Sequence, residues 1–123
     1  MSLEKASSIL AAAPFAAEPR DCSRLSADQM LEQATHAANF LKALSHEGRL
    51  MILCHLSSGE KSVTELELLL ESRQAAVSQQ LARLRLEGLV SCRREGKTIF
   101  YSIQDPKVSQ TISLVYEMFC KAA

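Results

Sequence analysis

The sequence predicts a mainly α-helical fold with one small β-hairpin. Two short segments with helical spacing of apolar residues, 64–71 and 74–86, are separated by Ser72-Arg73. Residues 89–94 then alternate between apolar and polar types, and residues 97–103 are rich in β-branched and aromatic residues. Helix, turn, helix and charged hairpin in this order are the outline of a winged helix-turn-helix, a fold that places a helix in a DNA groove.

Two helices are predicted before this segment. Residues 27–44 carry apolar side chains at steps of three and four, which predicts a first helix. We expect Ser45 to cap a second helix, with Glu47 in its first turn, where the helix dipole favours an anion. Residues 50–56 have almost no polar gap, so this helix should be covered on most sides before Gly59 ends it.

The next helix has two candidate capping boxes. Either Ser62 with Glu65 or Thr64 with Glu67 can satisfy the first backbone N–H groups. The helix over residues 74–86 should turn one apolar face to the core, formed by Val77, Leu81 and Leu84.

A tight turn at Glu95-Gly96 should close the hairpin, and a last helix should follow it. Asp105 is a suitable N-cap and Pro106 a suitable first helical residue. The apolar stripe of this helix consists of Val108, Ile112, Val115 and Phe119, widened by Leu114 and Met118. The predicted order is therefore α-α-α-α-β-β-α, within one domain of residues 27–123 that follows a mobile N-terminal tail of residues 1–26.

The charge is unevenly distributed. The chain of 123 residues has a formal net charge of zero, yet residues 73–97 contain six basic and two acidic residues, which leaves +4 there and −4 elsewhere. A basic face on an acidic body directs one surface toward phosphate. No apolar run reaches the length of a membrane helix, and residues 9–17 make a poor signal peptide, so we expect a cytoplasmic protein with no membrane partner.

The helix over residues 74–86 has the composition of a groove-reading helix. Its small alanines permit close approach, Gln79 can pair with adenine, and Arg83 can reach guanine or phosphate. A solvated amphipathic helix followed by an ordinary charged turn is the alternative, but the order and spacing of these residues favour DNA binding. The candidate DNA-contacting residues are Thr64, Gln74, Ala75, Ser78, Gln79, Gln80, Arg83, Arg93, Arg94 and Lys97.

The first and last helices carry more apolar surface than a small domain covers by itself. Their expected use is the interface of a twofold homodimer. Two reading heads also match DNA sites with twofold symmetry, so dimerisation and DNA reading support each other.

Residues 75–90, 94–101 and 41–56 resemble the ArsR family of bacterial winged-helix repressors, and the likeness extends over residues 28–120. It implies a homodimer that binds double-stranded operator DNA as a repressor. Family members commonly have His where this chain has Gln80, a departure that concerns groove contacts rather than the fold.

Metal-sensing members of that family use a Cys-x-Cys motif before the recognition helix, or Asp and His on the last helix. Neither is present here, and His36, His46 and His55 do not share the spacing of a common ligand face. We therefore predict no metal and no other cofactor, while a metal-responsive repressor remains the alternative function.

The four cysteines, at positions 22, 54, 92 and 120, form no CxxC pair and should be reduced in a cytosolic protein. Taken alone, Cys54 is typical of a small buried hydrophobic residue, because leucines and a methionine surround it in sequence. Cys120 continues the polar edge of the last helix and should be partly accessible.

The resemblance extends to the sulfide-responsive, SqrR/BigR-type branch of the family. It implies that Cys54 and Cys120 form the sensing pair, that persulfides are the inducer, and that genes for sulfide or reactive sulfur are regulated. Peroxide and disulfide stress remain alternative inducers. Cys22 could be an accessory thiol, whereas Cys92 is expected to be incidental.

Two other classes of function would require different features. An enzyme, such as a small thiol oxidoreductase or a persulfide carrier, would need a CxxC motif, a cofactor loop or an acid–base pair, and the sequence has none. We therefore predict that the chain is not an enzyme. The other class is a winged helix used for protein contacts; in that case, loss of Gln79, Arg83 and the cationic residues of the hairpin should leave DNA affinity unchanged.

Overall fold

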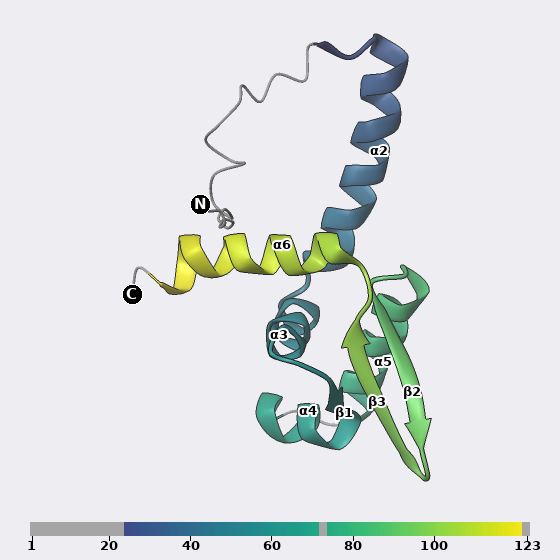
Figure 1. The fold of residues 1–123 in the computed structure, drawn as a ribbon, viewed down its shortest axis with the longest axis vertical. Coiled ribbons are helices and arrows are strands. Elements are labelled where there is room, and N and C mark those ends of the chain that lie inside the picture. The colour runs from purple at the N-terminus through teal and green to yellow at the C-terminus, as the bar shows by residue number, and fades with distance from the viewer. Residues whose placement is uncertain (1–23, 72–73, 122–123) are drawn as a thin grey trace, which may run out of the picture. The chain divides into compact units, whose positions relative to one another are not determined.

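The computed structural model describes residues 24–71 and 74–121 and has the predicted winged helix-turn-helix fold (Figure 1). The chain divides into two compact units, one up to His36 and one from Ala37 onward. The elements are α2 (Ala27–Leu44), α3 (Glu47–Leu56), β1 (Lys61–Ser62), α4 (Val63–Leu70), α5 (Gln74–Leu86), β2 (Val90–Glu95), β3 (Thr98–Ile103), α6 (Pro106–Val115) and the π-helical turn η3 (Tyr116–Cys120).

Helix α2 has the bounds that the sequence predicts. Its start is fixed by a reciprocal cap, in which Ser26 N–H donates to Gln29 Oε1 at 2.9 Å and Gln29 N–H donates to Ser26 Oγ at 3.1 Å. The apolar side chains of Met30 and Leu31 are exposed. The predicted tail lies outside the described residues up to position 23, and so does Cys22; the proposed domain boundary therefore stays a prediction.

Helix α3 is capped by His46, and the expectation of a Ser45 cap is wrong. The Ser45 hydroxyl instead donates backward to Lys42 O at 2.9 Å. His46 Nδ1 accepts from Gly48 N–H at 3.0 Å, so its ring satisfies an N-terminal donor of the helix. A Cβ at Gly48 would lie 3.2 Å from that ring, so the glycine makes room for the cap.

The expectation that α3 is covered on most sides is also wrong. Ile52, Leu53 and Leu56 are buried, but the side chain of Met51 is 49% exposed and Cys54 is exposed. The helix packs against α4, α5, β3 and α6, and a strip between these neighbours faces solvent.

The helix-turn-helix consists of α4 and α5. Ser62 makes the first of the two candidate capping boxes, because its Oγ accepts from Glu65 N–H at 3.1 Å and its N–H donates to Glu65 Oε1 at 2.7 Å. Helix α4 therefore begins at Val63, one residue before the predicted start. Glu71 ends it in the left-handed region, with φ 50°. The predicted core face of α5 is confirmed: Val77, Leu81 and Leu84 are buried.

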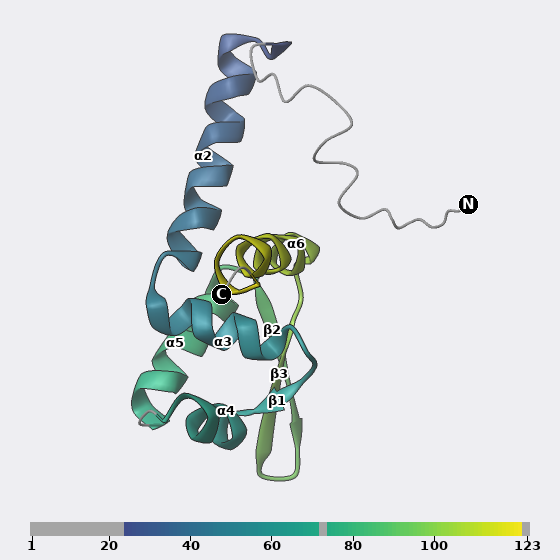
Figure 2. The same ribbon diagram turned by 90° about the vertical axis from the view of Figure 1, so that its left-hand side faces the viewer.

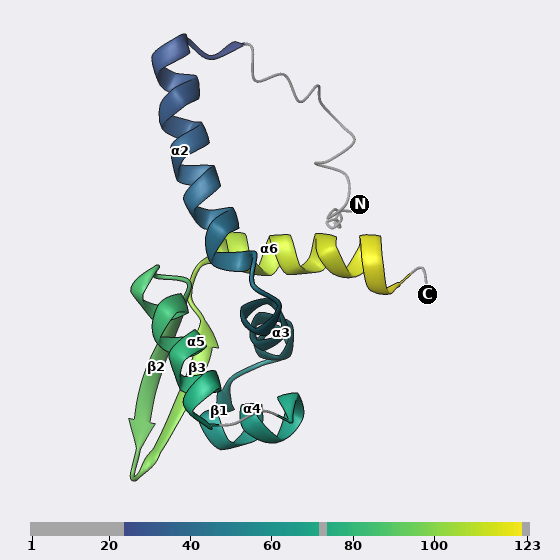
Figure 3. The same cartoon turned by 180° about the vertical axis from the view of Figure 1, so that it is seen from behind.

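The sheet has three antiparallel strands in the order β1-β3-β2, whereas the sequence predicted two. The missed strand β1 pairs Lys61 with Tyr101 and Ser62 with Phe100. In the hairpin, Glu95 pairs with Thr98, so the turn is Gly96-Lys97, one residue later than predicted. Figures 1, 2 and 3 all show the β2–β3 hairpin, hereafter the wing, projecting past α4 and α5.

The last helix begins as predicted, because the Asp105 side chain accepts from Lys107 N–H at 2.9 Å and Pro106 is its first residue. Its final turn widens into η3, where Lys121 N–H donates to Tyr116 O at 2.9 Å. Only part of the predicted apolar stripe is buried. Val108 and Ile112 enter the core, whereas Leu114, Met118 and Phe119 are exposed.

One apolar core joins the helices of the second unit to the sheet. It consists of Ala43, Leu44, Ile52, Leu53, Leu56, Leu66, Val77, Leu81, Leu84, Leu89, Val90, Val108 and Ile112. This core fixes α3 between α5, the second helix of the helix-turn-helix, on one side and α6 on the other. Among the described residues, no helix has both the length and the apolar character that crossing a membrane requires.

Candidate functional site

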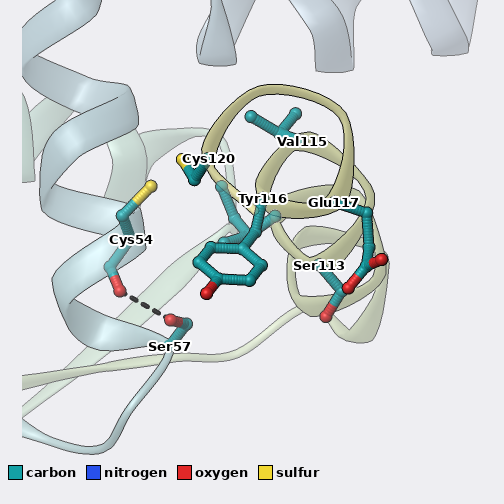
Figure 4. A pocket seen from close by; sticks show the side chains of 8 residues that line it. Cys54, Ser57, Ser113, Val115, Tyr116, Glu117 and Cys120 are labelled. Carbon is teal, nitrogen blue, oxygen red and sulfur yellow. Dashed lines mark hydrogen bonds between the residues drawn. The ribbon is translucent and has the colours of Figure 1, made fainter. Parts of the chain in front are cut away.

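Cys54 and Cys120 line one pocket of about 370 Å³. Cys54 comes from the last turn of α3 and Cys120 from η3, so two helices distant in sequence form the pocket. Figure 4 shows the two sulfur atoms pointing toward one another at one end of it. The complete lining is Cys54, Ser57, Ile112, Ser113, Val115, Tyr116, Glu117 and Cys120. The predicted packing of the last helix near the second is confirmed.

Cys54 is a free thiol held by the end of α3. Ser57 caps this end, and its hydroxyl donates to Cys54 O at 2.5 Å. The residue as a whole is exposed, so the sequence-based interpretation of a buried hydrophobic residue is wrong. Its thiol nevertheless points into the pocket, and this partial burial, together with the nearby Cys120, raises the pKa of Cys54 above its usual range. Cys54 therefore stays protonated near neutral pH.

Cys120 is a free and exposed thiol, as predicted. The wider π-helical turn places Tyr116 and Cys120 together on the side of the helix that faces the pocket (Figure 4). Lys121 follows directly, but its ammonium group lies 3.4 Å from Glu117 Oε1. Glu117, which also lines the pocket, is thus paired with Lys121.

Cys92 lies apart from this pair, on the wing. It is half-buried in β2 and pairs across the sheet with Tyr101. Burial first, and Cys92 after it, raise the pKa of the Tyr101 hydroxyl. Among the described cysteines, the fold thus brings two to a common pocket and leaves one on the sheet.

The candidate DNA-reading face of α5 is only partly described. The side chains of Ser78, Gln79 and Arg83 are exposed, whereas those of Gln74 and Ala75 lie outside the described residues. Thr64 is exposed in the first turn of α4; Arg83 forms an exposed ion pair with Glu87 at 3.3 Å. Such a pair is weak and can exchange for a phosphate.

Gln80 is half-buried and is engaged inside the protein. Its Oε1 accepts from Arg49 Nη1 at 3.1 Å, and the same guanidinium donates to Ala43 O at 2.6 Å and to Lys42 O at 3.2 Å. Gln80 thus helps to fix α5 to the end of α2 and the start of α3. This contact could not be predicted from the sequence, since no local pattern pairs residues 49 and 80.

Arg93, Arg94 and Lys97 are all exposed on the wing, but Arg93 is engaged. Its Nε and Nη2 donate to the two carboxylate oxygens of Glu60, each at 2.8 Å, and its Nη1 donates to Glu95 at 3.0 Å. The guanidinium also lies 4.7 Å from the ring centre of Phe100. Hydrogen bonding to Arg93 lowers the pKa of Glu60, and the two carboxylates raise that of Arg93. No local pattern in the sequence indicates this role of Glu60.

Among the described residues, no group of three or more His, Cys, Asp or Glu side chains is placed to hold a metal ion.

Residues 46–91 match the arsR family of bacterial regulatory proteins, a range from the cap of α3 into β2. A biofilm growth-associated repressor of Agrobacterium fabrum is 44% identical over 103 residues, which cover 84% of this chain and 88% of that protein. This chain belongs to the arsR family. Its winged helix-turn-helix fold follows both from the geometry above and from solved relatives.

Two solved structures show the extent of the likeness. Reduced HlyU from Vibrio cholerae aligns with a TM-score of 0.73 and 42% identity, covering 76% of this chain and 98% of that one. The transcriptional repressor BigR from Xylella fastidiosa aligns with a TM-score of 0.72 and 43% identity, covering 78% and 98%. Membership of a family of bacterial regulatory proteins agrees with the prediction of a transcriptional regulator rather than an enzyme.

Proposed function

We propose that this chain is a cytoplasmic, homodimeric repressor that binds operator DNA when reduced and is released when Cys54 and Cys120 are bridged. The observation that carries the proposal is the pocket in which both thiols face one another. Persulfides are the proposed inducers, and genes that handle sulfide or reactive sulfur are the proposed targets. The similarity to proteins described as repressors supports the DNA-binding part.

Cys120 reacts first in this proposal, because partial burial raises the pKa of the Cys54 thiol. A Cys120 thiolate attacks the outer sulfur of a persulfide, R–S–SH, giving Cys120–S–SH and releasing the thiolate R–S⁻. The Cys54 thiolate, formed by losing a proton to solvent, then attacks the inner sulfur of Cys120–S–SH. This step gives the Cys54–Cys120 disulfide and HS⁻, so the persulfide is the only oxidant required.

The reaction that forms a longer bridge balances as well. If both cysteines are first persulfidated, attack of one terminal sulfur on the inner sulfur of the other gives a trisulfide and one H₂S. The open pocket has space for the added sulfur atoms. A longer bridge spans Cα separations beyond the reach of an ordinary disulfide.

Bridging can reach the DNA surface because α3 lies between the pocket and the recognition helix. Helix α3 packs against α5 through the core and against α6 on the side of the pocket. A covalent tie from α3 to η3 therefore biases the position of α5, which must fit one major groove in each half-site.

The proposed homodimer uses the apolar surfaces that α2 and the last helix expose. Leu31 and Leu41 on α2, and Met118 and Phe119 in η3, are exposed in the described chain. Phe119→Ser should shift sedimentation toward the monomer at micromolar concentration. Leu68→Ser is the matched control, since Leu68 is as exposed as Phe119 but lies on α4, and it should leave the dimer intact.

The switch is tested by operator binding of serine variants. The probe is the tightest duplex selected from random DNA by the reduced wild-type protein, measured by fluorescence anisotropy. Cys54→Ser and Cys120→Ser should bind within about twofold of wild type, whereas persulfide treatment should weaken only wild type and the control Cys92→Ser, by about fivefold or more. Parallel treatments with peroxide and with oxidised glutathione identify the inducer. Release of either serine variant by persulfide contradicts the dithiol mechanism.

A further inference from the structure

We propose that the Glu60–Arg93 ion pair transmits the state of the dithiol to the wing; this inference rests on the proposed thiol switch. The pair connects the loop that leaves α3 with strand β2, and thus joins the helix that carries Cys54 to the hairpin that carries Arg94 and Lys97. We refer to it as the latch.

A short, well-bonded segment leads from the thiol to the latch. Ser57 lines the thiol pocket, caps α3 through its N–H to Leu53 O at 2.9 Å, and donates its hydroxyl to Cys54 O. Gly59 N–H then donates to Leu56 O at 3.0 Å and closes the turn. Glu60 follows at once. Because these hydrogen bonds constrain the turn, a displacement of the end of α3 should also displace Glu60.

The far side of the latch is held by the wing itself. Arg93 donates Nε and Nη2 to the two carboxylate oxygens of Glu60 in a bidentate arrangement, which fixes direction as well as distance. Its guanidinium lies over the ring of Phe100, its partner across the β2–β3 ladder. The guanidinium is thus fixed on the hairpin, so a change at Glu60 moves or frees the hairpin rather than a single side chain.

The latch also explains why an arginine in the middle of the wing is not available to DNA in this structure. Three hydrogen bonds to Glu60 and Glu95 already occupy Arg93, while Arg94 and Lys97 lie farther along toward the tip. Arg93 therefore acts as a positioning residue for the cations beside it.

In this account the closed latch belongs to the DNA-binding state and is lost or weakened when the dithiol is bridged. Opening the latch by substitution should lower the affinity of the reduced protein and leave that of the bridged protein unchanged. The reduced-to-bridged affinity ratio, which measures coupling, should then fall by about two- to fivefold, the range expected for an exposed ion pair.

The test compares Glu60→Gln with Glu95→Gln on the selected operator, each in the reduced and in the persulfide-bridged form. Both variants remove one carboxylate from Arg93, so their charge change is the same. Of these two carboxylates, only that of Glu60 lies in the loop after α3, whereas Glu95 lies in β2 itself. Hydrogen exchange of the wing amides is measured on wild type in both forms.

The reduced-to-bridged affinity ratio of Glu60→Gln should be at most half that of wild type, and the ratio of Glu95→Gln should equal that of wild type. Exchange of the β2–β3 amides should be faster in the bridged wild type. An unchanged ratio in Glu60→Gln, or an equal loss in both variants, overturns the latch while the thiol switch stands. A wild type whose affinity does not change on bridging overturns the switch and the latch together. Melting temperatures establish that each variant is folded.

Discussion

Lys97 offers a direct test of how the wing meets DNA. It lies in the two-residue turn at the tip, and the account assigns it a phosphate contact. Arg83, Arg94 and Lys97 are the cations assigned to phosphate; Arg93 is left out because two carboxylates already share its charge. Six such contacts in a dimer predict a slope of log K against log salt of about −5.

Lys97→Ala removes two of these contacts per dimer, so the slope of log K against log salt should become shallower, at about −3.5. The affinity should weaken to a similar degree on operator and on unrelated duplexes, because a phosphate contact carries no sequence information. The assay is anisotropy of labelled operator over a series of salt concentrations at constant pH.

Lys107→Ala is the matched control, because Lys107 is an exposed lysine at the start of α6 and pairs with Asp105 at 3.3 Å. Its slope should equal that of wild type. Equal slopes for Lys97→Ala and wild type would show that the wing tip does not touch phosphate, and a wild-type slope near zero would remove the DNA-binding assignment altogether.

Two further predictions concern stability and reactivity. Ser62→Ala deletes the cap of a serine that is only 6% exposed, so it should cost about 1 kcal/mol of folding free energy and lower Tm by about 4 °C in calorimetry, with Thr64→Ala as the control outside the box. Partial burial raises the pKa of Cys54 and so disfavours its thiolate form. The rate of Cys54 alkylation in Cys120→Ser should therefore still be rising with pH beyond the ordinary thiol pKa of about 8.5. A rate that reaches its plateau at lower pH would refute the raised pKa of Cys54.

Local patterns in the sequence predicted most of the fold. The bounds of α2 and α5 and the cap at Asp105 follow from apolar periodicity and from residues whose side chains accept N-terminal hydrogen bonds. The cap of α3 did not, since His46 is a rarer cap than serine and depends on the missing side chain of Gly48. Strand β1 is too short to show a period.

The candidate site depended on contacts that no local pattern contains. The pairing of Cys54 with Cys120 requires the crossing of α3 and α6, and was implied only by the family resemblance. The π-helical turn that presents Cys120 has no sequence signature comparable to a cap or a turn. The Glu60–Arg93 pair joins residues 33 positions apart, so the sequence showed a free wing arginine where the structure has an ion pair.

The central claim is that bridging Cys54 to Cys120 releases the protein from DNA. The most direct measurement follows operator occupancy and intact mass in the same wild-type sample during a persulfide titration, with peptide mapping of each bridge. The account predicts that the fraction released equals the fraction carrying a Cys54–Cys120 link of two or more sulfurs at every point. Release that precedes this link, or full bridging with the operator still bound, would contradict it.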